Sequence, residues 1–439
     1  MDKKQTLLCS YVDEARDIIA QAEKTIWENP ELGYTEWKTH AYLKAEYEKL
    51  GYTVVEAGNI PGFYVDVDTG KPGPKVLLVG EMDALVKPDH FANVNGLAHA
   101  CGHHAQCAAV LGAAYALKQP GALDGLCGSV RLMAVPAEEL GGSNLEDRLQ
   151  MVKDGIIQYT QGKPEFMARG YMDGVDIGMM VHTAHSENYY FRCDAGCNGV
   201  MYKHVVFTGK GKYANGTCAA NLAVSGVQAL LESLPDDQYI RIRSNIKLSN
   251  KARAELTFAF LSASLKTQEQ ISKSIDRVLV GAAIASSTQV EIFDNPGCAP
   301  MYHPAKLLQL VETVMGELVG ADKVLFHDYW NRGGADMGDL SCVIPCIHPN
   351  ACGASANAHS DSFYIDNLDR ACVNSAKAQL LTVQRLLEND AQKAQEVIRD
   401  FAPQAVPMAE YLARKSALSG IRRTEFTGED GEIQVALKA

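Results

Sequence analysis

Apolar residues recur at helical spacing within the first fifty positions. Those of residues 11–50 fall near one face of a predicted helix until a break at Asn29-Pro30. A second amphipathic stretch covers about residues 37–50 and ends at Gly51, a common helix stop. The apolar positions of the first stretch are Val12, Ile18, Ile19, Ala22 and Ile26.

Short apolar runs follow, each ending in small residues or a loop. Residues 75–79 (KVLLV), 129–135 (SVRLMAV) and 176–182 (DIGMMVH) are typical of strands that are buried on both faces. Residues 105–117 are rich in Ala and Leu and predict a buried helix. This alternation predicts an α/β fold with a parallel or mixed sheet.

The middle of the chain has a different order of elements. Strands are predicted at residues 201–207, 254–263 and 290–293, with helices at 223–234 and 267–280 between them. A chain of 439 residues is long enough for two domains or for a large domain with an insertion. We therefore expect a smaller α+β domain at residues 199–302, inserted into a larger domain of residues 1–198 and 303–439. Helices are expected near 304–319 and 366–389, and the segment after 403 is harder to place.

Composition and charge exclude several classes of protein. The net charge is −12, which disfavours nucleic acid and anionic membranes as partners because both are recognised mainly through Lys and Arg. The apolar stretches, such as residues 278–285, are far shorter than the ~20 residues that span a bilayer. The N-terminal residues become charged before any apolar segment of signal-peptide length. We expect a cytoplasmic protein.

The twelve cysteines show no disulfide-framework spacing, so reduced thiols are the simplest interpretation. Two groups, Cys193 with Cys197 and Cys342 with Cys346 and Cys352, lack the short paired spacing of a structural zinc site. We interpret both groups as small core residues.

Possible metal ligands follow the predicted strands, where open α/β sheets bind their ligands. Each segment alone has an ordinary explanation, since a strand-end Asp is often a cap and a lone His is often structural. Together they place His, Cys and carboxylate groups at successive strand ends, which suits zinc or manganese. The segments are residues 80–85 (GEMDAL), 99–104 (HACGHH), 136–139 (PAEE), 181–185 (VHTAH) and 358–363 (AHSDSF).

The order and spacing of these segments resemble the metallo-aminoacylase and carboxypeptidase family. The most similar branch holds the indole-acetyl-amino-acid, hippurate and aminobenzoyl-glutamate hydrolases. The resemblance extends over almost the whole chain and adds residues 29–36 (NPELGYTE) and 333–339 (GGADMGD). It implies a metallopeptidase-like catalytic domain with a mixed sheet, and an inserted lid or dimerisation domain.

The resemblance also implies a site with two divalent metal ions, zinc or manganese. Cys101 corresponds to the bridging ligand. The terminal ligands correspond to His103, Glu139, His182 and His359. Asp83 matches the carboxylate that orients a ligand, and Glu138 matches the general base.

The sequence departs from the family at substrate-binding positions. Tyr213 stands where relatives usually have an oxyanion-stabilising His; it either donates a hydrogen bond in its place or is a packing residue. Leu261 replaces an Arg that usually binds a substrate carboxylate, so the substrate lacks that group or another cation, Arg332 or Lys203, binds it. His104 occupies the position of a usual Asp. Tyr213, Asn221 and Arg332 are our candidate substrate-binding residues.

We expect an amidohydrolase that acts on a small N-acyl amino acid, an aryl-acyl amino acid or a dipeptide-like amide. One alternative is a binding or regulatory protein that kept the metals and lost efficient turnover. Another is a hydrolase with Cys101 or Cys107 as nucleophile, which leaves the recurring His and Glu residues unexplained. The resemblance further implies a homodimer formed through the inserted domain.

Overall fold

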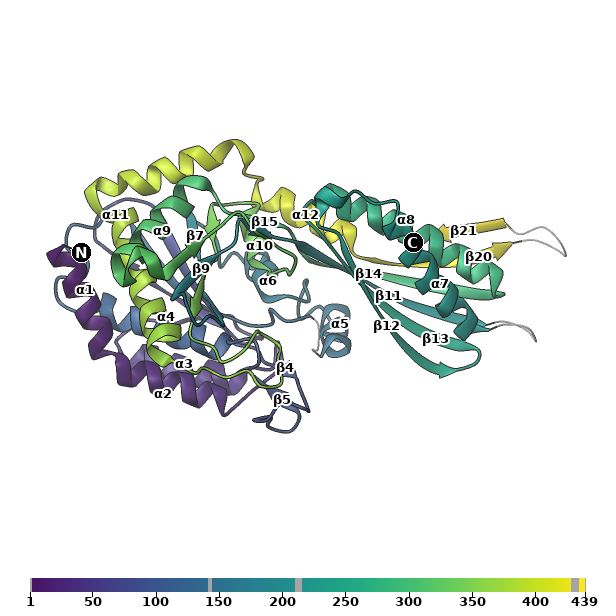
Figure 1. Ribbon diagram of the computed structural model, residues 1–439, viewed down its shortest axis with the longest axis horizontal. Helices are drawn as coiled ribbons and strands as arrows, with labels where there is room; N and C mark the ends of the chain where they lie inside the picture. Colours follow the sequence, from purple (N-terminus) through teal and green to yellow (C-terminus); the bar gives the residue numbers. More distant parts are fainter. Residues whose placement is uncertain (1, 141–143, 210–214, 428–433, 439) are drawn as a thin grey trace. The chain divides into compact units, whose positions relative to one another are not determined.

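The computed structural model describes residues 2–140, 144–209, 215–427 and 434–438 (Figure 1). The chain divides into two compact units. The first unit comprises Met1–Ala195, Tyr302–Tyr329 and Asp339–Met408. The second comprises Gly196–Met301, Trp330–Gly338 and Ala409–Ala439.

The first unit is built on a mixed sheet of order β1-β2-β6-β3-β7-β18. Its four strands from β6 to β18 run parallel, and β2 is antiparallel to β6. A second sheet has the order β16-β9-β19-β8. The strands are β1 (Val55–Glu56), β2 (Phe63–Asp68), β3 (Lys75–Glu81), β4 (Leu85–Val86), β5 (Leu97–Ala98), β6 (Ser129–Val135), β7 (Ile177–Met179), β8 (His182–Ala184), β9 (Phe191–Cys193), β16 (Val324–Phe326), β18 (Cys346–Ile347) and β19 (Asn350–Cys352).

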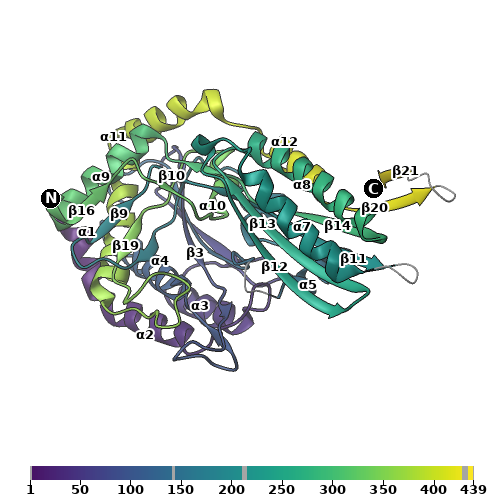
Figure 2. The same cartoon turned by 45° about the vertical axis from the view of Figure 1, so that its right-hand side comes forward.

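Helices pack against this sheet, and in both ribbon views α9 lies beside α11 (Figure 2). Helix α11 follows a π-helical turn at Asp369–Val373 and is interrupted at Glu388–Ala391 by non-helical backbone. The helices are α1 (Lys3–Glu14), α2 (Arg16–Trp27), α3 (Trp37–Lys49), α4 (His103–Leu117), α5 (Leu145–Lys153), α6 (Gly162–Ala168), α9 (Ala305–Val319), α10 (Met337–Ser341) and α11 (Asn374–Phe401).

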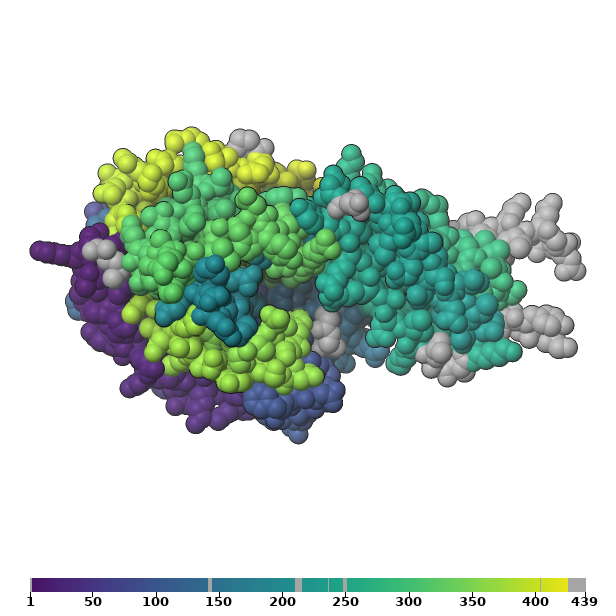
Figure 3. All heavy atoms as spheres, in the orientation of Figure 1, coloured from purple at the N-terminus to yellow at the C-terminus, as the bar shows by residue number. Residues whose placement is uncertain are grey.

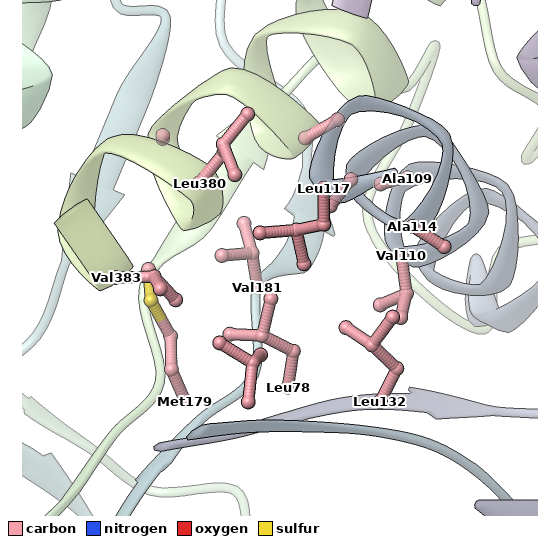
Figure 4. Close-up of a cluster of buried hydrophobic side chains, with 14 of the residues drawn as sticks. Leu78, Ala109, Val110, Ala114, Leu117, Leu132, Met179, Val181, Leu380 and Val383 are labelled. Atoms are coloured by element: carbon pink, nitrogen blue, oxygen red, sulfur yellow. The ribbon is translucent and has the colours of Figure 1, made fainter. Parts of the chain in front are cut away.

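Helix α4 is buried along almost its whole length. Small Ala side chains let α2, α11 and β3 approach it closely from different directions. In Figure 4, side chains of β3, β6 and β7 point from the sheet towards α4 and α11. The residues in this contact include Leu78, Leu132, Met179, Val110, Leu117, Leu380 and Val383. This packing fixes the start of α4, where His103 lies.

The second unit is an antiparallel sheet of order β12-β13-β11-β14-β20-β21 with two helices packed on it. Burial alternates along β11 and β13, so that Phe207, Phe258 and Phe260 face α7 and α8. The elements are β10 (Gly196–Cys197), β11 (Gly199–Gly209), α7 (Gly216–Leu231), β12 (Arg241–Asn250), β13 (Arg253–Ser262), α8 (Leu265–Ala285), β14 (Thr288–Cys298), β15 (Met301–Tyr302), β17 (Trp330–Asn331), α12 (Met408–Leu418), β20 (Gly420–Thr427) and β21 (Gln434–Lys438).

A buried charge network joins β20 to this sheet. The ammonium group of Lys203 lies 2.8 Å from Asp276 and also contacts Asp294. The guanidinium of Arg422 on β20 pairs with the same two carboxylates, at 2.5 Å for Asp276. Lys203 is fully buried, so the two aspartates are neutralised by Lys203 on β11 and by Arg422 on β20.

The mixed α/β architecture agrees with the sequence prediction, and several details differ. The run predicted as one strand at 176–182 is divided, because β7 ends at Met179 and His182 begins β8 of the other sheet. Strand β12 was not predicted. Residues 330–338 and 409–439 belong to the second unit rather than to the larger domain, because β20 pairs with β14. No helix among the described residues is long and apolar enough to cross a membrane.

Candidate metal centre

Two parallel strands bring the first group of site residues together. Glu81 ends β3 opposite Val135, the last residue of β6, and Met82 continues the ladder with a hydrogen bond to the Val135 carbonyl at 3.0 Å. Ala137 then adopts a left-handed conformation (φ 57°) and donates its N–H to the Glu36 carboxylate at 2.8 Å. This turn places Glu138 and Glu139 beside Asp83.

A tight turn sets the positions of Cys101 and His103. Gly102 between them has φ 93°, a left-handed conformation that is open to glycine at little cost. A Cβ atom at this position would come within 2.1 Å of the Thr183 hydroxyl. Glycine therefore allows the turn to pack against β8, next to His182.

Among the described residues of the first unit, the possible ligand atoms form three overlapping groups, and the atoms of each group lie within 4.8 Å of one another. Cys101 belongs to two of them, one with His103 and His182 and one with Glu139 and His359. The third group contains His103, Glu138 and Glu139. A thiolate shared between two sets of ligands is compatible with a dinuclear centre.

Two buried atoms of this cluster are suited to a cation. Within the described residues, Nε2 of His103 and Oε1 of Glu139 lack a hydrogen bond of good geometry, although Oε2 of Glu81 lies 3.2 Å from the first atom and Nε2 of His359 lies 3.1 Å from the second. Buried polar atoms are costly when left without partners. Imidazole nitrogen, carboxylate oxygen and thiolate sulfur are all ligands of zinc, so the residues present fit a divalent ion.

The neighbouring groups orient these ligands. Asp83 accepts a hydrogen bond from Nδ1 of His103 at 3.1 Å and another from the Glu139 N–H at 2.9 Å. Nδ1 of His182 donates to the Thr183 carbonyl at 2.8 Å. Both imidazoles therefore turn Nε2 towards the cluster, as carboxylate- and carbonyl-supported metal ligands do.

The charged groups of the cluster shift one another's pKa values. Burial raises the pKa of Cys101, but His103, His182 and His359 outweigh it and hold that pKa well below its usual range. Burial and the Cys101 thiolate raise the pKa of Glu139 to about 7. Cys101 and Glu139 in turn raise the pKa of His359 to about 11. The metal-free cluster therefore holds protons that a bound cation would displace.

The structure adds two residues that the sequence analysis did not single out. Oε2 of Glu81 lies 3.2 Å from Nε2 of His103, and its other oxygen contacts the fully buried ammonium of Lys163. Burial raises the pKa of Glu81, but Lys163, His103 and His182 lower it to about 2. Glu81 is a charged neighbour of the ligands. The sequence signal was its place in the GEMDAL segment, whereas Lys163 lies in no motif.

The structure brings together seven of the ten predicted site residues, all in the first unit: Asp83, Cys101, His103, Glu138, Glu139, His182 and His359. Tyr213 lies outside the described residues. Asn221 and Arg332 are both exposed and belong to the second unit, and their roles stay predictions.

The structure decides between some of the roles that the sequence left open for single residues. Lys203 is buried between two aspartates, so it is not available to a substrate carboxylate. Cys107 is buried, donates to the Glu81 carbonyl and has a raised pKa because of burial, which are properties of an inert thiol. His104 is buried with Nε2 3.3 Å from the Glu23 carboxylate.

Comparisons with known proteins agree with this geometry. The model of peptidase family M20/M25/M40 matches residues 77–385. Thermostable carboxypeptidase 2 of Saccharolobus solfataricus is 34% identical over 181 residues, which are 40% of this chain and only 41% of the carboxypeptidase. Human Xaa-Arg dipeptidase is 26% identical over 390 residues, 80% of each chain.

The fold is shared with a solved structure. A dinuclear metal-binding peptidase of the M20 family from Bacillus subtilis superposes with a TM-score of 0.65 at 19% identity, over 85% of this chain and 99% of that one. At this identity the likeness concerns the fold alone. The family match covers more than half of the chain and includes all seven residues of the cluster. The chain therefore belongs to peptidase family M20/M25/M40.

Proposed function

We propose that this protein hydrolyses the amide bond of a small N-acyl amino acid, aryl-acyl amino acid or dipeptide-like compound with two bound divalent ions, zinc or manganese. The observation that supports the proposal most directly is the sharing of Cys101 between two ligand groups. One ion would be held by Cys101, His103 and His182, and the other by Cys101, Glu139 and His359.

The reaction needs an activated water and a proton carrier. Two divalent ions lower the pKa of bound water towards about 7 and polarise the amide carbonyl. Glu138 would accept the proton of the attacking water and later donate it to the leaving amine. Its side chain is 13% exposed, and its backbone carbonyl is held by Gln161 at 2.9 Å. Glu138 is thus fixed in place yet open to a water molecule.

We infer the substrate class from the relatives of this protein and from Leu261, which stands where relatives usually have an arginine. A carboxypeptidase and an Xaa-Arg dipeptidase both release an amino acid from an amide bond. Leu261 on β13 offers no charge, so a substrate carboxylate would need another partner. We keep Arg332 for this role and Tyr213 and Asn221 as further substrate-binding residues.

The proposal predicts separate effects on metal binding and on turnover. We would measure metal content by elemental mass spectrometry and hydrolysis of a panel of N-acyl amino acids and dipeptides. Wild type, Glu138→Gln and the control Glu14→Gln, an exposed carboxylate on α1, should each bind about two ions per chain. Turnover should fall about 10²–10⁴-fold in Glu138→Gln alone, as expected for loss of a general base.

Each other outcome supports a different conclusion. Two bound ions without turnover by wild type on any substrate would favour a binding or regulatory protein. Full turnover by Glu138→Gln would contradict the assigned base. A wild type without bound metal would contradict the ligand assignment.

We also propose a homodimer formed through the second unit. Strand β12 pairs with β13, and no other described strand pairs with its outer edge. An edge of ten residues can pair with the same edge of a second copy across a two-fold axis. The opposite side of the sheet is extended by β20 and β21 of the same chain.

A further inference from the structure

A short hairpin connects Asp83 to the Cys101 turn. Its strands β4 and β5 pair Leu85 with Ala98 and Val86 with Leu97. We refer to residues 85–98 as the hairpin and to residues 359–363 as the ligand loop. In Figure 3 the blue spheres of the hairpin lie against the yellow-green spheres of the ligand loop.

The hairpin bonds to three alternate carbonyl groups of the ligand loop. Nζ of Lys87 donates to the His359 carbonyl at 2.9 Å. The Phe91 N–H donates to the Asp361 carbonyl at 3.2 Å. The imidazole of His90 faces the Phe363 carbonyl through Nε2 at 2.8 Å. The hairpin thus holds the backbone carbonyl groups of residues 359, 361 and 363.

The bond from His90 has a defined direction. Nδ1 of His90 accepts the Ala92 N–H at 3.2 Å, so the proton is on Nε2 and is donated to the ligand loop. His90 is buried. It is a fixed part of the contact between the two segments.

The ligand loop needs this support because of its conformation. His359 has φ 67°, a left-handed conformation that is uncommon for residues other than glycine. Its side chain is 52% exposed, whereas that of His103 is 1% exposed. Packing therefore constrains His359 little. Its backbone is held by the His359 N–H bond to the Ala100 carbonyl at 2.7 Å and by Lys87.

A simpler role for Lys87 is an ion pair on the surface. Its ammonium also pairs with Asp361 at 2.5 Å, and exposed ion pairs contribute little to stability. The carbonyl bond distinguishes it, because a charged donor to the backbone of a predicted ligand acts on the position of that ligand. Only 23% of the Lys87 side chain is exposed, so water does not readily replace it.

We propose that Lys87 is a positioning residue that holds His359 in the geometry needed to bind the second metal ion. This inference rests on the proposed ligand set and adds the hairpin to the metal centre. Outer groups that orient a ligand typically change metal affinity 10–100-fold when removed. Lys87 acts on the Cys101, Glu139 and His359 group, because its ammonium contacts the His359 carbonyl and the Asp361 carboxylate of the ligand loop.

The test measures metal affinity by competition with a chromogenic zinc chelator. In Lys87→Met, one ion should bind as in wild type and the other about 10–100-fold more weakly. Lys87→Arg retains a charged donor and should recover most of the loss. The control is Lys118→Met, since Lys118 also donates to a backbone carbonyl, that of Gly51 at 2.9 Å, and is remote from the ligand loop.

Melting of the metal-free proteins separates positioning from folding. Lys87→Met and wild type should melt alike in chelator, because the expected defect is in metal binding. Unchanged affinity for both ions in Lys87→Met, or an equal loss in Lys118→Met, would overturn the inference. Wild type that binds two ions but hydrolyses nothing would contradict the proposed function while this inference stands. Wild type without metal would overturn both.

Discussion

Replacement of Gly102 by Ala tests how tightly the turn between Cys101 and His103 is constrained. The added Cβ would lie 2.1 Å from the Thr183 hydroxyl oxygen and 3.1 Å from the Phe363 ring. Backbone strain at φ 93° costs an L residue about 1–2 kcal/mol, and overpacking of a buried site adds about 1–3 kcal/mol. We expect Gly102→Ala to lower the free energy of unfolding by about 2–5 kcal/mol.

Gly58→Ala is the matched control. Gly58 has φ 77°, and an added Cβ would meet no atom within 4 Å, so this variant reports backbone strain without a clash. It should cost about 1–2 kcal/mol. The difference between the two variants measures the contacts with Thr183 and Phe363. Urea unfolding of the metal-free proteins gives both values, and metal titration shows whether Cys101 and His103 still bind together.

A double variant isolates the clash. Thr183→Ala removes the hydroxyl oxygen but leaves a Cβ atom 3.2 Å from the added methyl group. Gly102→Ala with Thr183→Ala should therefore regain part of the excess loss, because the contacts with the Thr183 Cβ and the Phe363 ring remain. The reasoning is refuted if Gly102→Ala costs no more than Gly58→Ala, or if the double variant is no more stable than Gly102→Ala.

Two further predictions concern the second unit. Arg422→Met removes a partner of the buried Asp276 and Asp294 and should lower the free energy of unfolding by about 2–3 kcal/mol, because the guanidinium is partly exposed. Arg423→Met, from an exposed pair with Glu291, should cost less than about 1 kcal/mol in the same urea experiment, and equal losses would contradict the network. The homodimer predicts a mass of two chains by light scattering at micromolar concentration. A monomeric mass would exclude it.

The sequence predicted elements best where periodicity was strong. The predicted strand 129–135 coincides with β6, and the Ala-rich helix differs from α4 only at its start. Strand β12 was missed because it is an edge strand in which Arg241, Arg243 and Lys247 are exposed, so it lacks a clear apolar period. Strand β20 was missed for a similar reason, since its sequence begins GIRRTE.

The cluster of candidate metal ligands was predictable in part, because Asp83, Glu138 and Glu139 follow strands β3 and β6, which end at the same edge of one sheet. The partners that neutralise the buried charges could not be predicted in the same way. Lys163 and Glu81 are 82 positions apart, and a lysine outside any motif gives no sign that it will be buried. Arg422 pairs with an aspartate 146 positions earlier. Such partners depend on tertiary packing that one sequence does not reveal.

The pairing of β20 with β14 sets an order of events during synthesis. Thr424 bonds to Val290 across 134 positions of sequence, so a ribosome must make that whole stretch before β14 gains its outer neighbour. Until then, the nascent second unit exposes a strand edge and lacks the arginine that faces Asp276 and Asp294. Residues 199–302 expressed alone would remain in that unfinished state. A fragment that also contains residues 409–427 includes β20 and should be a more stable isolated unit.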